Sequence, residues 1–169
     1  VCDVWQDRRE TAARRVNENY AQIFGGGSYQ SCAAYRDYRE VLARPDIDAV
    51  LIATPVHWHG VMAIQAAKAG KDIYCEKPVA ITIRESQAIK EVVQRYGRVF
   101  QAGTQQRSEY GGKFRRACEL IRNGAIGTLK EVYSCRPGGS FAWNRFDPPQ
   151  PVPPELDWDL ALGPAPWQE

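Results

Sequence analysis

The stretch from residue 47 to residue 78 constrains the fold more than any other part of the chain. Residues 49–53 form an unbroken apolar run, residues 57–69 carry apolar side chains at helical spacing, and residues 72–75 are short enough for a second strand. Gly70 stands between them, where a helix C-terminus favours a positive φ. Strands that are apolar on both faces are typical of a parallel sheet with helices on each side. The stretch therefore predicts a β-α-β unit.

The rest of the chain continues this alternation of strands and helices. We expect further helices at residues 7–21 (with Asp7 as the cap), 35–42, 82–96 (opened by a Thr82–Glu85 capping box) and 108–123. We expect further strands at residues 1–5, 99–102 and 128–135, with residues 1–5 in the same parallel sheet as 49–53, 72–75 and 99–102. Such an order predicts a doubly wound α/β fold.

Eight of the eleven prolines lie between residues 137 and 166, and this density predicts neither a helix nor a central strand there. We divide the chain into a doubly wound domain at residues 1–106 and the beginning of a second domain at residues 107–169.

Composition excludes several classes of function. The net charge of +2 and the lack of an apolar run of membrane-spanning length favour neither a nucleic-acid nor a membrane partner. His57 and His59 are the only histidines, and the five cysteines are scattered without a CxxC pair, so we expect no metal site. The chain opens inside an apolar run and shows no targeting signal. Either a cytoplasmic protein or one exported in folded form agrees with this start.

Four motifs carry a family resemblance: T-P-V-H-W-H at residues 54–59, Y-C-E-K-P at 74–78, F-Q-A-G-T-Q-Q-R at 100–107 and I-R-N-G-A-I-G-T-L-K-E-V at 121–132. Together they resemble the glucose–fructose oxidoreductase and inositol dehydrogenase family (Gfo/Idh/MocA). The resemblance implies a Rossmann-type sheet whose first βα unit, with its glycine fingerprint, is missing, followed by an incomplete α+β substrate domain. It also implies hydride transfer between a nicotinamide cofactor and a sugar, polyol or related hydroxyl compound.

The resemblance implies a set of cofactor-binding residues: Asp3, Thr54, Pro55, His57, His59, Glu76, Lys77 and Gln105. An acid at the position of Asp3 hydrogen-bonds the adenosine ribose, which favours NAD over NADP because a carboxylate repels a 2′-phosphate. Asp3 as a turn or helix-entry residue, and His59 as a packed or capping histidine, are alternatives that the residues leave open.

Lys77 is the predicted catalytic residue, since oxidising a secondary alcohol requires a group that relays the hydroxyl proton. Lys77 and Arg107 are also expected to contact substrate. An ion pair at the end of a strand is the alternative for Glu76 and Lys77, and an ordinary polar strand exit is the alternative for Gln105 and Arg107. We expect these 169 residues by themselves to be inactive and the complete protein to form a homo-oligomer. The competing hypothesis is a non-catalytic remnant or assembly module that keeps the fold without turnover.

Overall fold

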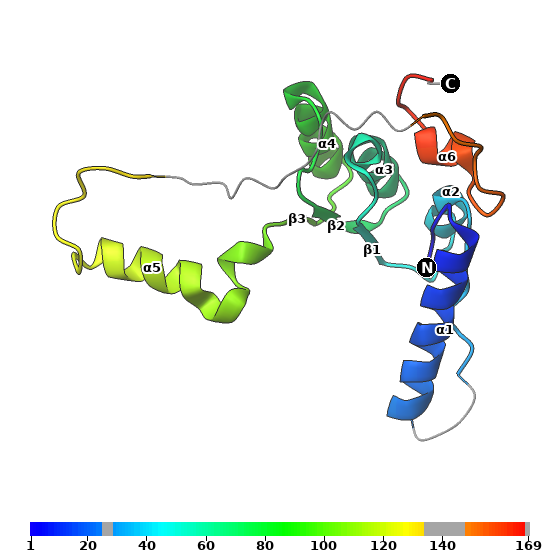
Figure 1. The fold of residues 1–169 in the computed structure, drawn as a ribbon, viewed down its shortest axis with the longest axis horizontal. Coiled ribbons are helices and arrows are strands. Elements are labelled where there is room, and N and C mark those ends of the chain that lie inside the picture. The colour runs from blue at the N-terminus through cyan, green and yellow to red at the C-terminus, as the bar shows by residue number, and fades with distance from the viewer. Residues whose placement is uncertain (25–28, 134–147, 168–169) are drawn as a thin grey trace. The chain divides into compact units, whose positions relative to one another are not determined.

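The computed structural model describes residues 1–24, 29–133 and 148–167, and its centre is a three-stranded parallel sheet (Figure 1). The strands are β1 (Ala49–Ile52), β2 (Asp72–Glu76) and β3 (Phe100–Gly103), paired in the order β1-β2-β3. Leu51 is paired with Tyr74 across the first two strands. These strands coincide with three of the predicted apolar segments, so their predicted parallel arrangement and the α/β class are confirmed.

Two compact units make up the chain. The first contains Val1–Gly103 together with Gln150–Glu169, and the second contains Thr104–Pro149. The proline-rich end of the chain thus returns to the first unit. The predicted division into a nucleotide-binding domain ending at residue 106 and a substrate domain from residue 107 stays a prediction.

Helices α3 (Val56–Lys68) and α4 (Ile83–Arg95) lie on the same side of the sheet (Figure 1). The core between these layers consists of buried apolar side chains: Ile52, Ile73 and Cys75 from the strands, Ala63, Ala66 and Ala67 from α3, and Ile89 from α4. The alanines let α3 approach the sheet closely because they project little beyond the helix backbone. On the opposite face of the sheet, Leu51 is 68% exposed.

Local signals end and begin these helices as the sequence predicts. Gly70 has φ 78°, and the N–H of Lys71 donates to Ala66 O at 3.0 Å, which is the Schellman arrangement at the end of α3. Thr82 and Glu85 form the predicted capping box at the start of α4. Both signals depend on neighbouring residues alone, which explains why the sequence reveals them.

The prediction that residues 1–5 join the parallel sheet is wrong. In the parts of the chain that the structure describes, Cys2 forms a single parallel bridge with Tyr35, and Trp5 forms a single antiparallel bridge with Leu156. Neither bridge connects these residues to a strand of the sheet.

A local turn explains this departure. Asp3 Oδ1 accepts a hydrogen bond from the N–H of Trp5 at 2.8 Å and turns the chain into α1 (Gln6–Ile23) after only a few extended residues. Trp5 occupies the N-cap position, so the predicted capping by Asp7 is also wrong. Asp7 lies in the first turn, where a carboxylate interacts favourably with the helix dipole.

The predicted short helix is α2 (Tyr38–Leu42). In the second unit, α5 (Lys113–Arg122) begins five residues later than the predicted helix, because Gly111 and Gly112 have φ values of 66° and 68° and interrupt a regular start. The predicted strand at residues 128–135 is not present in its described part, residues 128–133; residues 134 and 135 lie outside the described residues. An alternating sequence cannot form a strand without a neighbour that pairs with it.

The proline-rich segment contains a helix that the sequence argument excluded. Helix α6 (Trp158–Leu162) lies between Pro154 and Pro164, and Asp157 Oδ1 accepts a hydrogen bond from the N–H of Leu160 at 3.0 Å at its start. Five residues without proline suffice for one capped turn, so proline density limits the length of a helix rather than its existence.

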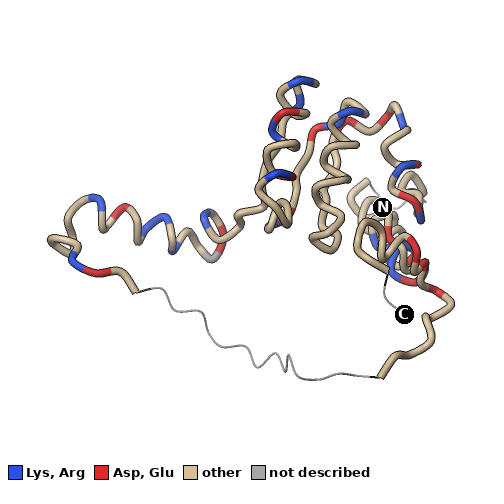
Figure 2. The backbone as a smooth tube through the Cα atoms, turned by 90° about the horizontal axis from the view of Figure 1, so that it is seen from above, with Lys and Arg blue, Asp and Glu red and all other residues tan. Residues whose placement is uncertain are grey.

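Charged residues of both signs are interspersed along the described chain (Figure 2). None of the helices in the described ranges is long and apolar enough to cross a membrane.

Candidate functional site

The N-terminus of α3 follows directly from the end of β1. Pro55 occupies the N-cap position, and no side chain caps the helix. In the first turn, the N–H of Trp58 donates to Pro55 O at 3.0 Å, whereas the N–H groups of Val56 and His57 have no side-chain acceptor among the described residues. A helix N-terminus also carries a partial positive charge, which favours an anionic or strongly polar ligand. Thr54 and Pro55 therefore lie where a ligand of this kind could be held.

His59 ties this turn to the end of the neighbouring strand. Its side chain is 2% exposed, with Nε2 2.7 Å from Thr54 O and Nδ1 2.7 Å from Pro78 O. A neutral imidazole has one N–H and donates to one of these carbonyls, whereas a ring with protons on both nitrogens donates to both. The residue thus braces the chain segments that leave β1 and β2. Its predicted contact with a cofactor stays a prediction, and in this arrangement its contribution would be indirect.

Lys77 leaves the carboxyl end of β2 at the segment that His59 braces. Its side chain is exposed, and its peptide bond with Pro78 is cis. Glu76, the last residue of β2, lies against Gly103 of β3: a Cβ at Gly103 would be 3.0 Å from Glu76 Oε2 and 3.1 Å from Glu76 Cα. Glycine at this position therefore leaves room for the glutamate side chain. The structure brings Thr54, His59 and Lys77 together, at the edge of the sheet where open α/β proteins bind ligands.

Cys75 lies immediately before Glu76 and is fully buried. Burial raises the pKa of its thiol to about 11, and the charge of Glu76 acts in the same direction. The thiol therefore remains protonated at neutral pH, and Cys75 is not an activated nucleophile. No three side chains of His, Cys, Asp or Glu gather into a metal-binding group among the residues described.

Asp3 is half-buried and takes part in the turn that leads into α1. Its backbone carbonyl accepts a hydrogen bond from Arg9 Nη1 at 3.4 Å. This position corresponds to the helix-entry alternative that the sequence left open. A carboxylate oxygen engaged by a backbone N–H can accept further hydrogen bonds, so the ribose contact stays a prediction.

Gln105 and Arg107 belong to the short helix η1 (Gln105–Arg107) in the second unit. Their predicted proximity to Lys77 depends on how the two units are arranged and stays a prediction.

Two contacts at the start of α3 were not anticipated. His57 Nε2 lies 3.0 Å from Ala161 O, and Trp58 Nε1–H donates to Leu160 O at 2.9 Å. Both acceptors belong to α6, about one hundred residues further along the chain. A signal for α6 did exist in the sequence, since Asp157 precedes the apolar residues as a cap and Gly163 follows them.

The parallel sheet, its crossover helices and the braced strand ends define a Rossmann-type α/β protein. A family model described as an oxidoreductase family with an NAD-binding Rossmann fold matches residues 6–104, which is more than half of the chain. The chain therefore belongs to the Gfo/Idh/MocA oxidoreductase family.

The chain is similar to a scyllo-inositol 2-dehydrogenase (NAD(+)) of Bacillus subtilis, with 41% identity over 97 residues that cover 57% of this chain and 27% of that protein. A glycosyl hydrolase family 109 protein of Shewanella putrefaciens is 34% identical over 132 residues, covering 76% of this chain and 27% of that protein. A solved NAD-binding protein from Listeria innocua has 33% identity and a TM-score of 0.61, covering 75% of this chain and 33% of its own. The chain thus spans about a quarter to a third of the length of these proteins.

Proposed function

We propose that the chain is the cofactor-binding part of an NAD-dependent oxidoreductase that transfers hydride between a sugar or polyol hydroxyl carbon and nicotinamide. The observation that carries this proposal is the pair of contacts that the His59 ring makes with Thr54 O and Pro78 O, here called the His59 brace. It ties the turn before α3 to the Lys77–Pro78 segment, so a side chain capable of proton transfer leaves the sheet beside an uncapped helix N-terminus. The substrate class is supported by the inositol dehydrogenase among the relatives.

The described residues fit part of a dinucleotide. The first turn of α3, which no side chain caps, would offer N–H groups to the ribose and nicotinamide half of the cofactor. Asp3 supplies the carboxylate for a ribose hydroxyl, and its negative charge disfavours a 2′-phosphate, so we propose NAD rather than NADP. When bound, the cofactor accepts or donates the hydride.

Lys77 would hold the substrate hydroxyl and relay its proton as the carbon is oxidised. This effect is largest in the transition state, where charge develops on the oxygen. We therefore expect Lys77→Ala to lower kcat by about 100-fold or more while NAD affinity changes by less than about tenfold.

The measurement is steady-state formation of reduced nicotinamide with scyllo-inositol, myo-inositol and a panel of sugars, using the longest natural chain that carries these residues. Lys90→Ala is the matched control, because Lys90 is an exposed lysine on α4. If Lys77→Ala retains normal turnover, the lysine is structural and the proposed role is wrong.

Glycoside cleavage is a second candidate, favoured by the glycosyl hydrolase family 109 relative, whose match covers 76% of this chain. Release of nitrophenol from nitrophenyl glycosides, without net formation of reduced nicotinamide, would support it over the dehydrogenase. A folded protein that binds NAD and turns over neither class of substrate would correspond to the non-catalytic assembly module.

A further inference from the structure

Residues 155–163, here called the strap, connect the two ends of the candidate cofactor site. At one end, the N–H of Gln6 donates to Glu155 O at 3.0 Å, and the N–H of Asp157 donates to Val4 O at 3.2 Å. These contacts lie on the chain immediately after Asp3.

At its other end, the strap reaches the first turn of α3. Leu160 O accepts the indole N–H of Trp58, and Ala161 O lies 3.0 Å from His57 Nε2. In the ranges that the structure describes, residues 1–5 form no bridge with β1. The strap is therefore a direct link between the Asp3 turn and the α3 turn.

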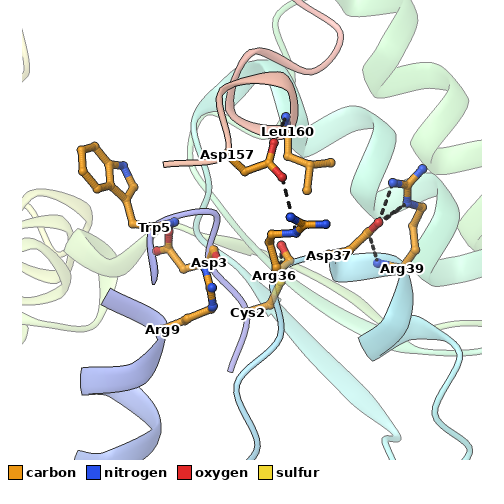
Figure 3. A network of polar contacts seen from close by, with 9 residues as sticks. All are labelled: Cys2, Asp3, Trp5, Arg9, Arg36, Asp37, Arg39, Asp157 and Leu160. Carbon is orange, nitrogen blue, oxygen red and sulfur yellow. Dashed lines mark hydrogen bonds and ion pairs between the residues drawn. The ribbon is translucent and has the colours of Figure 1, made fainter. Parts of the chain in front are cut away.

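Asp157 holds the middle of the strap. Its Oδ1 caps α6 through Leu160, and its Oδ2 lies 3.4 Å from Arg36 Nε (Figure 3). Arg36 O in turn lies 3.6 Å from Cys2 Sγ, beside Asp3. One carboxylate thus orders the helix that contacts α3 and also interacts with the segment that bridges to Cys2.

Gly163 lies against the ring of Trp58. It has φ 52°, and a Cβ built on it would lie 2.2 Å from Cζ2 and 2.3 Å from Cε2 of the Trp58 ring. Tyr38 packs against the same ring edge-on, with 5.4 Å between ring centroids. The indole therefore packs against Tyr38 and also against a backbone position that has no room for a side chain.

We propose that the strap is a positioning element: docked on Trp58, it sets the separation between the Asp3 turn and the α3 turn and thereby the affinity for NAD. This inference rests on the proposed function. His57 and Trp58 are positioning residues in it, since His57 Nε2 and Trp58 Nε1 contact the strap.

Gly163→Ala tests the inference, because its methyl group would displace the strap from the indole. We expect hydrogen exchange in residues 155–163, followed by mass spectrometry, to become at least tenfold faster. We also expect the Kd for NAD to rise by about tenfold, which matches the loss of two side-chain hydrogen bonds at the α3 turn. Gly97→Ala is the control: Gly97 also has a positive φ, 61°, but its added methyl group would meet nothing within 4 Å.

A double variant separates docking on the indole from backbone strain at Gly163. Alanine at position 58 has no ring for the new methyl group to strike, so Gly163→Ala should have much less effect on exchange and on Kd when introduced into Trp58→Ala. Equal effects in both backgrounds would show that the contact with Trp58 does not hold the strap. Trp58→Phe provides a milder variant if Gly163→Ala alone does not fold.

Two further outcomes would contradict either the positioning role of the strap or the proposed function. Faster exchange in the strap with an unchanged or tighter Kd would overturn the positioning role and leave the proposed function intact. If the wild-type protein binds no NAD, the proposed function is wrong and the positioning role falls with it.

Discussion

Replacing His59 with leucine removes the brace between the ends of β1 and β2 while keeping a side chain of similar size. The imidazole is 2% exposed, and its two nitrogens each lie 2.7 Å from a backbone carbonyl oxygen. Leaving a buried polar group without its partner costs about 1–3 kcal/mol. At least one of the two carbonyls loses its donor, and both lie beyond a strand end that water can partly reach, so we expect a loss of about 2 kcal/mol in the free energy of unfolding. For a chain of this length, that loss lowers Tm by roughly 6 °C.

Thermal and urea unfolding followed by circular dichroism would measure this loss, and hydrogen exchange would locate it in the segment after β2. His57→Leu is the control on the same helix. His57 is half-buried with one ring contact at 3.0 Å, so it should cost about 1 kcal/mol or less. Equal losses for the two variants, or a loss below about 0.5 kcal/mol for His59→Leu, would refute the brace.

Two further predictions concern buried polar groups. Lys71 is 5% exposed and donates from Nζ to Arg44 O at 2.6 Å and Ile47 O at 2.8 Å, so Lys71→Met should lower the unfolding free energy by about 2 kcal/mol in urea titrations. Because burial raises the pKa of Cys75 from 9.0 to about 11, its thiol stays protonated in the native protein at pH 9 and should react with iodoacetamide far more slowly than exposed Cys118. Between pH 9 and about 11 this thiol ionises in the unfolded chain before it does in the native protein, so the free energy of unfolding should fall over that interval. Mass spectrometry that finds Cys75 and Cys118 alkylated at equal rates in folded protein would contradict this reasoning.

The local part of the fold could be predicted from the sequence. Apolar runs predicted β1, β2 and β3, because a strand buried against helices needs apolar side chains whatever else surrounds it. The capping box of Thr82 and Glu85 and the positive φ of Gly70 depend on residues next to them in the chain. The sequence also indicated that Thr54, His59 and Lys77 would meet, since the carboxyl ends of neighbouring parallel strands share one edge.

Tertiary structure decided what depends on distant partners. The order of the strands was predictable, but the pairing of residues 1–5 was not, because Trp5 finds its bridge partner in Leu156. The residues next to Trp58 in the sequence do not predict that its indole donates to a carbonyl of α6. The residues next to Gly163 do not predict that the absence of a side chain there leaves room for the indole ring. The spacing of apolar residues in a helix, the helix caps and the turns all depend on residues that are close together in the sequence. A hydrogen bond across one hundred residues exists only once the core has brought both segments together, which is why the sequence predicts the site's elements and the fold determines which of them make contact.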